Sequence, residues 1–401
     1  MSKILILGGG FAGLWAALAA AREVVEHAAT IPITLVSQDE YLTIRPRLYE
    51  KNPQQLRIPL RPILDLLEIE FVQGVVRTID SKGQMVDMER VNGVAKSLPY
   101  DRLILATGSE LRELPIPGML ENGFNIDTYS AAVALDQHLR KVIKKPYAPG
   151  NDTIVIVGAG FTGIELATEM RRRLKEYADD DAVSKVRIVL VERSEVVAPD
   201  LGVNPRPVIE AALQHANVEV ILSNQVHKID PDNVTMNDGE TIQCCTTILT
   251  AGLRASSLAA AIPIETDKLG RIPVDEMLRV RGLPNVFATG DIACAYADHD
   301  HLALMSCQHA LTMGKFAGYN AARQLLDLPL RPYVQTDYVT CLDLGDSGAV
   351  FTTGWDRRIQ MTGEKAKQLK RTINTKWIYP PQNDRTALLS AANIDAGHRS
   401  S

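Results

Sequence analysis

Two stretches of the sequence repeat one pattern, in which an apolar strand is followed at once by glycines and the start of a helix. They read ILILGGGFAGLW at residues 4–15 and VIVGAGFTGIEL at residues 155–166, and both have the spacing GxGxxG. In a dinucleotide-binding unit the first glycine makes the tight turn, the second lets the backbone approach a pyrophosphate, and the third lets the helix pack close to the strand. The helix N-terminus then presents free N–H groups to the phosphates. Two copies predict two bound dinucleotides that can face each other.

Length, charge and composition exclude several classes of protein. The chain has 401 residues, which favours two or three domains, and its net charge of −5 with 5% aromatic residues gives no reason to expect nucleic-acid binding. We find no apolar run long enough for a signal peptide or a spanning helix, so we expect a cytoplasmic protein. The five cysteines have neither CxxC nor CxxxxC spacing, which argues against a metal site and favours reduced thiols.

The order of the predicted elements places one dinucleotide-binding unit inside the other. We expect an α/β fold with two Rossmann-like domains, the second inserted in the first, and a small α+β C-terminal region. The first domain should comprise residues 1–113 and 276–328, with a long helix at about 304–326, and the second should comprise residues 114–275. The C-terminal interface region is expected at residues 329–401.

An acidic residue at the end of the second strand of each unit would hold the ribose hydroxyl groups. In the second unit, VRIVLVER places Glu192 there, and its carboxylate would repel a 2′-phosphate, which favours NADH over NADPH. The neighbouring Arg193 works against this preference. In the first unit Ser37 stands where the acid is usual, and Asp39 follows two residues later.

Six motifs, in their order and spacing, carry a resemblance to a known group of enzymes. They are GGGFAGL (8–14), LILATGS (103–109), GAGFTGIELATE (158–169), LTAGLRAS (249–256), GRIPVD (270–275) and FATGDIA (287–293). They resemble the two-dinucleotide-binding-domain flavoproteins of the pyridine nucleotide-disulfide oxidoreductase type, and within them the type II NADH dehydrogenases. The resemblance covers residues 3–325. It implies an FAD-dependent NAD(P)H oxidoreductase, in which hydride passes from NADH to N5 of FAD and electrons then pass to a quinone or similar small acceptor.

The resemblance also implies which residues hold the two cofactors, FAD in the first domain and NAD(H) in the second. For FAD the expected residues are Gly8, Gly10, Phe11, Ala12, Gly13, Ser37, Arg47, Thr107, Gly108, Asp291 and Gln308. For NAD(H) they are Gly158, Gly160, Gly163, Glu192 and Gly252. Asp291 would bond the ribityl chain of FAD. PRLYE, residues 46–50, resembles the segment that lies against the isoalloxazine ring, with Arg47 and Tyr49 as candidates for that surface.

Three residues are candidate catalytic groups: Glu165, Cys307 and Gln308. The family has a glutamate at the position of Glu165, near the nicotinamide–flavin contact, where it could position nicotinamide or relay a proton. The alternative is a helix N-terminal acid that merely complements the dipole. The family's AQxAxQQ segment, associated with the quinone, corresponds to CQHALTM at residues 307–313. Gln308 and Ala310 are retained, whereas Thr312 and Met313 replace the paired glutamines.

The residues leave the electron acceptor open. The first helix, LWAALAAAREVV, has no cysteine, which disfavours the disulfide-reductase chemistry of this fold. A quinone is the first alternative. The second is a soluble relative that acts as an NAD(P)H oxidase or reduces a metabolite or an electron-carrier protein. The third is an NADH- and FAD-binding redox sensor that gates a partner.

The C-terminal region offers a surface for a membrane or for a second copy of the chain. Residues 356–377 contain seven Lys or Arg, and Leu369, Ile373 and Trp377 fall four apart, on one face of a predicted helix. Such a helix either lies peripherally on the inner face of the cell membrane or packs on its own protein with a solvated basic face. The resemblance implies a homodimer through this region. The polar residues 385–401 are expected to be disordered.

Overall fold

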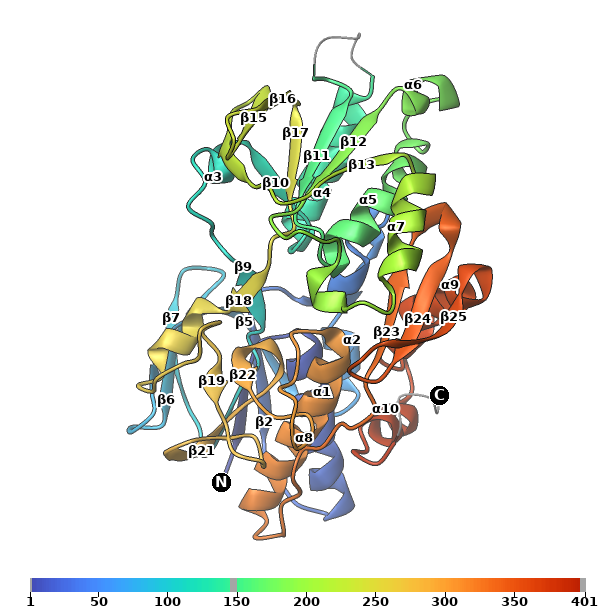
Figure 1. Ribbon diagram of the computed structural model, residues 1–401. Helices are drawn as coiled ribbons and strands as arrows, with labels where there is room; N and C mark the ends of the chain where they lie inside the picture. The colour runs from blue at the N-terminus through green and yellow to red at the C-terminus, as the bar shows by residue number, and fades with distance from the viewer. Residues whose placement is uncertain (1, 145–149, 397–401) are drawn as a thin grey trace.

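The computed structural model describes residues 2–144 and 150–396, and Figure 1 shows two sheets, one above the other, with a small C-terminal sheet beside them. The stretch KKPYAPGN at residues 144–151 has the proline and glycine content typical of a linker, and its residues 145–149 lie outside the described residues. This arrangement confirms the predicted α/β fold with two Rossmann-like units and a C-terminal α+β region. The domain boundaries given above stay predictions.

The first sheet has eight strands, and the chain completes it only after the second sheet has formed. Their order is β20 (Arg279–Val280), β21 (Leu283–Ala288), β8 (Arg102–Leu105), β1 (Ile4–Leu7), β2 (Ile33–Ser37), β5 (Glu70–Asp80), β6 (Met85–Arg90) and β7 (Ala95–Pro99). The five strands from β21 to β5 are parallel, and β1 is buried throughout, as an apolar run covered on both faces should be. Because β20 and β21 come from the late part of the chain, the second unit is inserted in the first.

The second sheet has five parallel strands, and helices cover it. Its order is β10 (Gly123–Asn125), β17 (Thr246–Leu249), β11 (Thr153–Val157), β12 (Arg187–Val191) and β13 (Val218–Ile221). The helices of this unit are α4 (Tyr129–Val142), α5 (Phe161–Leu174), α6 (Asp180–Ser184) and α7 (Arg206–His215). Two connecting segments between the units pair with each other as the antiparallel strands β9 (Ser109–Leu111) and β18 (Leu253–Ala255).

Short elements complete the two units. The remaining strands are β3 (Tyr41–Thr43), β4 (Arg57–Pro59), β14 (Val226–Ile229), β15 (Asn233–Met236), β16 (Thr241–Gln243), β19 (Ile272–Pro273) and β22 (Ala293–Cys294). The remaining short helices are α2 (Arg61–Asp65), α3 (Met119–Asn122), η1 (Arg45–Arg47), η2 (Pro53–Gln55), η3 (Pro199–Leu201), η4 (Ser257–Ala261), η5 (Gly290–Ile292) and η6 (Gly345–Ser347).

The two glycine turns have the geometry that their spacing predicts. The first glycine of each turn has a positive φ, +112° at Gly8 and +105° at Gly158, which favours glycine. A Cβ on the third glycine would lie 1.8 Å from the carbonyl oxygen of Gly8 at Gly13, and 1.9 Å from that of Gly158 at Gly163. A Cβ on the second glycine, Gly10 or Gly160, would meet nothing within 4 Å. The space in front of the second glycine is therefore open to a ligand.

Helices α1 (Phe11–Glu26) and α8 (Cys307–Leu325) pack side by side on the first sheet through small residues. A Cβ on Gly314 would lie 2.4 Å from the carbonyl oxygen of Ala12, and one on Gly318 would lie 2.0 Å from that of Ala16. Helix α8 begins at Cys307, later than predicted, because the side chain of Ser306 accepts a hydrogen bond from the backbone N–H of His309 and caps it.

The predicted basic helix at residues 356–377 is wrong in its first part. The C-terminal sheet consists of β23 (Val339–Asp343), β24 (Ala349–Thr353) and β25 (Arg358–Thr362), and it is followed by α9 (Gly363–Thr372) and one π-helical turn, η7 (Ile373–Trp377). Leu369 and Ile373 pack against buried residues of β23 and β24, so the apolar side of α9 lies on its own protein. A helical period alone could not show that residues 358–362 pair with β24.

The expectation that residues 385–401 are disordered is wrong for the part that the structure describes. Arg385–Ala391 form helix α10, which packs on α1, and Leu388 is fully buried. The guanidinium of Arg22 donates to the carbonyl oxygen of Leu389 at 2.8 Å. The few apolar residues of this segment suffice because they meet an existing surface. Residues 397–401 lie outside the described part of the chain.

No described helix is both long and apolar enough to cross a membrane.

The contact between α1 and α8 predicts the effect of adding one methyl group. Gly318→Ala should lower the free energy of unfolding by about 1–3 kcal/mol, because the new Cβ must displace the backbone of α1. Urea denaturation measures this change. Gly160→Ala is the matched control, since its Cβ meets nothing and its φ is −79°, and it should change stability by less than about 0.5 kcal/mol without NADH. Equal stability of Gly318→Ala and the wild type would contradict the close contact.

Candidate functional site

One cavity of about 1640 Å³ runs between the two sheets and the C-terminal sheet. Its walls come from the first glycine turn, from the starts of α5 and α8, and from β23 and α9. The predicted site residues on its lining are Gly8, Gly10, Phe11, Ala12, Ser37, Thr107, Gly108, Glu165, Asp291, Cys307 and Gln308. Segments that are far apart in the sequence thus share one space. Tertiary structure brings most of the predicted FAD residues together with all three candidate catalytic groups.

Buried polar atoms without partners line this cavity where the sequence predicts the FAD site. The hydroxyl oxygen of Thr107 and the amide nitrogen of Gln308 are buried and have no hydrogen-bond partner among the described residues. Leaving such groups unsatisfied costs about 1–3 kcal/mol each. With the open space in front of Gly10, they fit a polar ligand that would complete these hydrogen bonds. Gly13 lies beneath the turn, where it holds α1 against β1.

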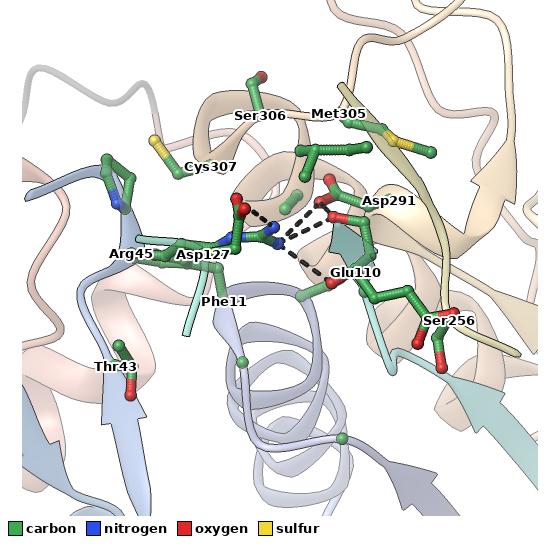
Figure 2. Close-up of a pocket in the computed structure, with 18 of the residues that line it drawn as sticks. Phe11, Thr43, Arg45, Glu110, Asp127, Ser256, Asp291, Met305, Ser306 and Cys307 are labelled. Carbon is green, nitrogen blue, oxygen red and sulfur yellow. Dashed lines mark hydrogen bonds and ion pairs between the residues drawn. The ribbon is translucent and has the colours of Figure 1, made fainter. Parts of the chain in front are cut away.

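Asp291 and Arg45 lie next to each other on the cavity lining (Figure 2). The hydroxyl of Ser109 donates to Asp291 at 2.5 Å, and the guanidinium of Arg45 lies 3.9 Å from the same carboxylate. Burial raises the pKa of Asp291 above its usual range, and Ser109 and Arg45 oppose that shift. Arg45 also donates to the hydroxyl of Ser109 at 2.8 Å and to Asp127 at 3.2 Å.

The arginine that reaches the cavity is not the one that the sequence suggested. Arg47 is absent from the lining, and its guanidinium instead binds the carboxylate of Glu50 at 2.7 Å and the hydroxyl of Tyr379 at 2.8 Å. Arg45, two residues earlier, lines the cavity, as does Tyr49. Nothing in IRPRLYE distinguishes the two arginines, because the 3₁₀ turn at 45–47 determines which one points inward.

The predicted NAD(H) residues cluster on the second glycine turn, outside the cavity lining. The carboxylate of Glu192 accepts hydrogen bonds from the backbone N–H of Ala159 at 2.8 Å and of Ser194 at 2.9 Å. Glu192 is therefore held against the turn that opens α5. The cavity reaches this unit through Phe161 and Glu165 on α5, and through Leu253, the neighbour of Gly252. Gly158, Gly160 and Gly163 form the turn itself.

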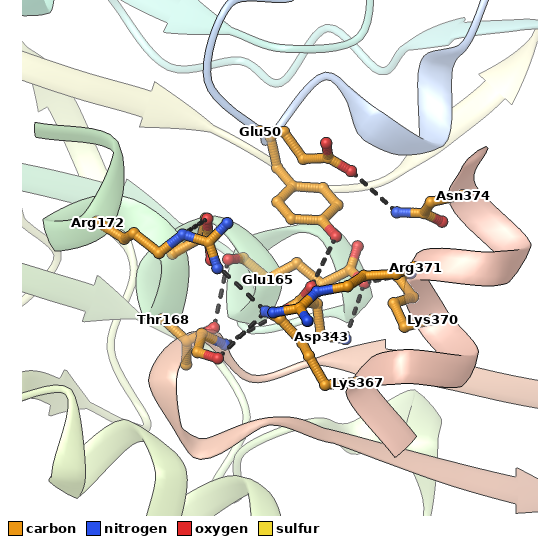
Figure 3. Close-up of polar contacts among 12 residues, drawn as sticks. Glu50, Glu165, Thr168, Arg172, Asp343, Lys367, Lys370, Arg371 and Asn374 are labelled. Atoms are coloured by element: carbon orange, nitrogen blue, oxygen red, sulfur yellow. Dashed lines mark hydrogen bonds and ion pairs between the residues drawn. The ribbon is translucent and has the colours of Figure 1, made fainter. Parts of the chain in front are cut away.

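A buried cluster of charges joins α5 to the C-terminal region (Figure 3). Glu165 accepts from the Lys370 ammonium at 2.7 Å and from the backbone N–H of Asp343 at 3.0 Å. Lys367 binds Asp343 and lies 3.8 Å from Glu169. Glu165 and Glu169 are one helical turn apart, and so are Lys367 and Lys370, so two acids on one helix face two lysines on the other.

Burial sets the protonation of this cluster. It raises the pKa of Glu165 to about 7 against the opposing effect of Lys370, and it raises that of Glu169 to about 7 against the effect of Lys367. Burial also disfavours the ammonium of Lys370, but the Glu165 carboxylate outweighs this effect, so the pKa of Lys370 lies above its usual value. Glu165 and Lys370 line the cavity, whereas Glu169 and Lys367 do not. The two lysines were expected on a solvated basic face, because their distant partners are invisible in the sequence.

The first turn of α8 supplies Cys307 and Gln308 to the cavity. Cys341 also lines it, and burial raises the pKa of both thiols to about 11, so neither is a thiolate near neutral pH. Thr312 and Met313, the two departures from the family pattern, do not line the cavity, and Met313 is buried in the core. Neither replacement residue therefore contributes to the lining.

Two largely parallel sheets, each followed by a glycine turn that begins a helix, with a cavity between them that the first turn and the start of α5 line, are the architecture of a two-dinucleotide oxidoreductase. Residues 2–314 match the family described as pyridine nucleotide-disulphide oxidoreductase. An NADH dehydrogenase-like protein of Mycobacterium tuberculosis is 43% identical over 397 residues, which cover 98% of each chain. A type II NADH:quinone oxidoreductase of Staphylococcus epidermidis is 27% identical, covering 94% of this chain and 95% of that one.

The solved structure of NDH2 from Plasmodium falciparum in complex with NADH has the same fold. It matches with a TM-score of 0.80 at 14% identity and covers 98% of this chain and 96% of that chain. The chain therefore belongs to the pyridine nucleotide-disulphide oxidoreductase family. FAD and NADH, the cofactors expected from the sequence, are typical of these homologues.

The two raised pKa values predict how stability depends on pH. A carboxyl group whose pKa rises from 4.5 to about 7 on folding holds its proton more tightly in the folded chain. As the pH increases from about 4.5 to about 7, the unfolded chain loses this proton first, so the free energy of unfolding falls. Glutamine does not titrate. Between pH 4.5 and pH 7 the free energy of unfolding of each variant, Glu165→Gln or Glu169→Gln, should therefore rise by about 2–3 kcal/mol relative to that of the wild type.

Urea denaturation at pH 5 and pH 8 measures this difference. Glu364→Gln, which removes an exposed carboxylate from α9, controls for the loss of one charge. If the free energy of unfolding changed equally with pH in the wild type, Glu165→Gln and Glu169→Gln, the raised pKa values of the two glutamates would be contradicted.

Proposed function

We propose that this chain is an FAD-dependent NADH oxidoreductase that passes electrons to a quinone or a similar small acceptor. The observation that carries the proposal is the single cavity, which is lined by the first glycine turn, by Glu165 on α5 and by Gln308 on α8. Two cofactors and an acceptor must meet in one space for such a reaction. The related Staphylococcus epidermidis protein, named a type II NADH:quinone oxidoreductase, supports the quinone as acceptor.

The residues of the first unit would hold FAD. Gly8 and Gly10, with the N-terminus of α1, would receive its pyrophosphate, and Asp291 would accept from its ribityl hydroxyls. Ser37 stands at the ribose position. Arg45 takes the place that the sequence suggested for Arg47. Bound FAD supplies two-electron chemistry, accepting hydride from NADH and passing electrons to the acceptor.

The residues of the second unit would hold NADH. The N–H groups at the start of α5, behind Gly158 and Gly160, would receive its pyrophosphate. The carboxylate of Glu192, already fixed beside this turn, would accept from a ribose hydroxyl and repel a 2′-phosphate. The cavity continues from Phe161 on this helix toward Gln308, so nicotinamide has access to the flavin end.

The start of α8 would stabilise negative charge on the reduced ring. Its 19 residues place the positive end of the helix dipole at the cavity, where Ser306 and Cys307 form part of the wall. The partnerless amide of Gln308 would donate a hydrogen bond there. The buried Cys307 thiol fills space beside this turn, and its raised pKa argues against a role as nucleophile.

Glu165 would deliver a proton to the acceptor. Reduction of a quinone to a hydroquinone by NADH takes the hydride of NADH and one further proton, and a carboxyl group with a pKa of about 7 is a suitable donor of that proton near neutral pH. The Lys370 ammonium, 2.7 Å away, stabilises the carboxylate that remains. Of the two acids on this face of α5, only Glu165 reaches the cavity.

A second candidate is a soluble acceptor, such as a metabolite, oxygen or an electron-carrier protein. The observation that favours it is the packing of α9, whose apolar side lies on β23 and β24 and whose Lys367 and Lys370 point inward. No amphipathic surface on this helix is then left for a lipid bilayer. Peripheral membrane association and a homodimer stay predictions.

Anaerobic stopped-flow spectroscopy tests the proposed function. NADH should bleach the bound flavin within milliseconds to seconds, and NADPH should do so at least about tenfold more slowly because Glu192 repels its 2′-phosphate. Mixing the reduced enzyme with a soluble quinone should restore the oxidised spectrum. Fast bleaching with reoxidation only by air would favour the second candidate. Slow bleaching despite tight NADH binding would overturn the proposal and favour a redox sensor.

The two glutamates of α5 provide a matched pair of variants for the proton donor. Glu165→Gln should slow reoxidation by quinone about 100-fold or more, because general acid catalysis contributes about 10²–10⁴-fold. Bleaching by NADH should stay within a few-fold of the wild type. The wild-type rate should fall as the pH rises through about 7, and Glu165→Gln should lose this dependence.

Glu169→Gln is the control, because Glu169 has the same raised pKa but does not line the cavity. This variant should keep both the rate of reoxidation and its pH dependence. If both variants lost the same fraction of the reoxidation rate, the buried charges between α5 and α9 would act only by holding the structure together.

A further inference from the structure

Tyr338 and Arg357 line the cavity but belong to neither cofactor site described above. Tyr338 directly precedes β23, the strand that continues along the cavity wall to Cys341. Its ring centroid lies 5.6 Å from that of His309, on the first turn of α8. The carbonyl oxygen of Cys341 accepts from Lys370 at 2.9 Å. One strand therefore connects the proposed proton donor with an aromatic wall beside α8.

A column of aromatic rings holds Tyr338 in place. Trp355 stacks on Tyr338 with centroids 4.3 Å apart and an interplanar angle of 17°, and His301 stacks on Trp355 at 4.4 Å and 7°. The carboxylate of Asp298 accepts from the indole N–H of Trp355 at 2.8 Å and pairs with the His301 ring at 2.9 Å. A ring fixed in this way is pre-organised to pack against a ligand, because little side-chain entropy remains to be lost.

Arg357 brings a positive charge to the same wall. Its guanidinium donates to the hydroxyl of Tyr338 at 3.3 Å, and its Nε is buried without a hydrogen-bond partner. Within the described part of the chain, no ion pair involves Arg357, whereas the cavity-lining Arg45 pairs with Asp127 and Lys370 pairs with Glu165. A partly buried guanidinium without a carboxylate is suited to bind an anion from a ligand.

The surroundings of Arg357 favour an anion on a flat, apolar body. The backbone turn that carries it is fixed, because the N–H of Arg357 donates to Gly354 and the N–H of Gly354 donates to Tyr338. The positive end of α8 is close by, since His309 on its first turn contacts Tyr338. The lining residues Leu304 and Met305, just before α8, and Val339, next to Tyr338, are apolar.

We propose that Tyr338, Arg357 and the first turn of α8 form an acceptor subsite for a planar quinoid ring that carries an anionic oxygen. The ring packs against Tyr338, and the anionic oxygen accepts from the guanidinium of Arg357. A neutral ring leaves that charge without a partner, so the subsite distinguishes acidic quinones from neutral ones. This inference rests on the proposed function, because it names the class of acceptor that the same cavity selects.

Binding to the oxidised holoenzyme tests the subsite without turnover. The probes are lawsone, a hydroxynaphthoquinone that is anionic at neutral pH, and menadione, a neutral methylnaphthoquinone, each titrated by calorimetry. Arg357→Gln should raise the Kd of lawsone about tenfold or more, because a hydrogen bond to a charged group is lost, and should change that of menadione less than about twofold. Tyr338→Leu should weaken both ligands, whereas Tyr338→Phe should preserve menadione binding.

Arg358→Gln is the matched control. Arg358 is the next residue, is 77% exposed, pairs with Asp356 and does not line the cavity. Its loss should leave both Kd values unchanged. Flavin content and Tm show whether each variant is folded.

Equal effects of Arg357→Gln on the two quinones, or no effect on either, would overturn the subsite, as would a wild type that binds neither probe. Bleaching of the wild-type flavin by NADH in the same preparation tests the proposed function separately from the acceptor subsite. Normal bleaching with no discrimination between the quinones refutes the subsite alone. Absent bleaching refutes the proposed function, while the two Kd values still decide whether Arg357 binds an anion.

Discussion

The two glycine turns and the helices around the cavity depend on places where a helix touches backbone with no side chain between them. The missing Cβ at Gly13 and Gly163 lets α1 and α5 reach the carbonyl oxygens of their own glycine turns, and this directs the two helix N-termini at the two proposed cofactor sites. The same device acts between helices, because Gly318 lets α8 lie directly on the backbone of α1. Because α8 packs directly on α1, its first turn lies on the same cavity wall as the first glycine turn. The cavity is therefore a consequence of backbone contact.

The buried charges between α5 and α9 provide the second organising contact. A buried ion pair is weak support for stability, because removing two charges from water offsets most of their attraction. It does restrict geometry, since each carboxylate must face its ammonium. Glu165 and Lys370 therefore hold the C-terminal sheet against the second unit and close one side of the cavity. Burial raises the pKa of Glu165 to about 7 against the effect of Lys370, so this one contact positions the wall and holds the group that we propose as proton donor.

Much of the site could be predicted because it lies in local motifs. The three glycines of each turn have local steric tasks, and Thr107, Asp291 and Gln308 each end a strand or begin a helix at the same edge of the sheet, so all three line the cavity. Predictions failed where the outcome depended on distant partners. Arg45 rather than Arg47 reaches the cavity, because Glu50 and Tyr379 bind the second arginine. Residues 358–362 form a strand because β24 offers an edge, and residues 385–391 form a helix because α1 offers a surface.

The sequence by itself determined the two dinucleotide-binding units, their nesting and the identity of the residues on each glycine turn. The two units and their turn residues follow from steric and hydrogen-bonding requirements within about fifteen neighbouring residues, and the order of the elements along the chain indicates the nesting. Only the tertiary structure decided that Glu165 is paired with Lys370 and that Tyr338 stands beside Arg357. Members of each pair come from different elements, and their burial, pKa and partners arise only when those elements pack. Charge and aromatic type are visible in the sequence, but the dielectric and the neighbours that give them a function are properties of the folded chain.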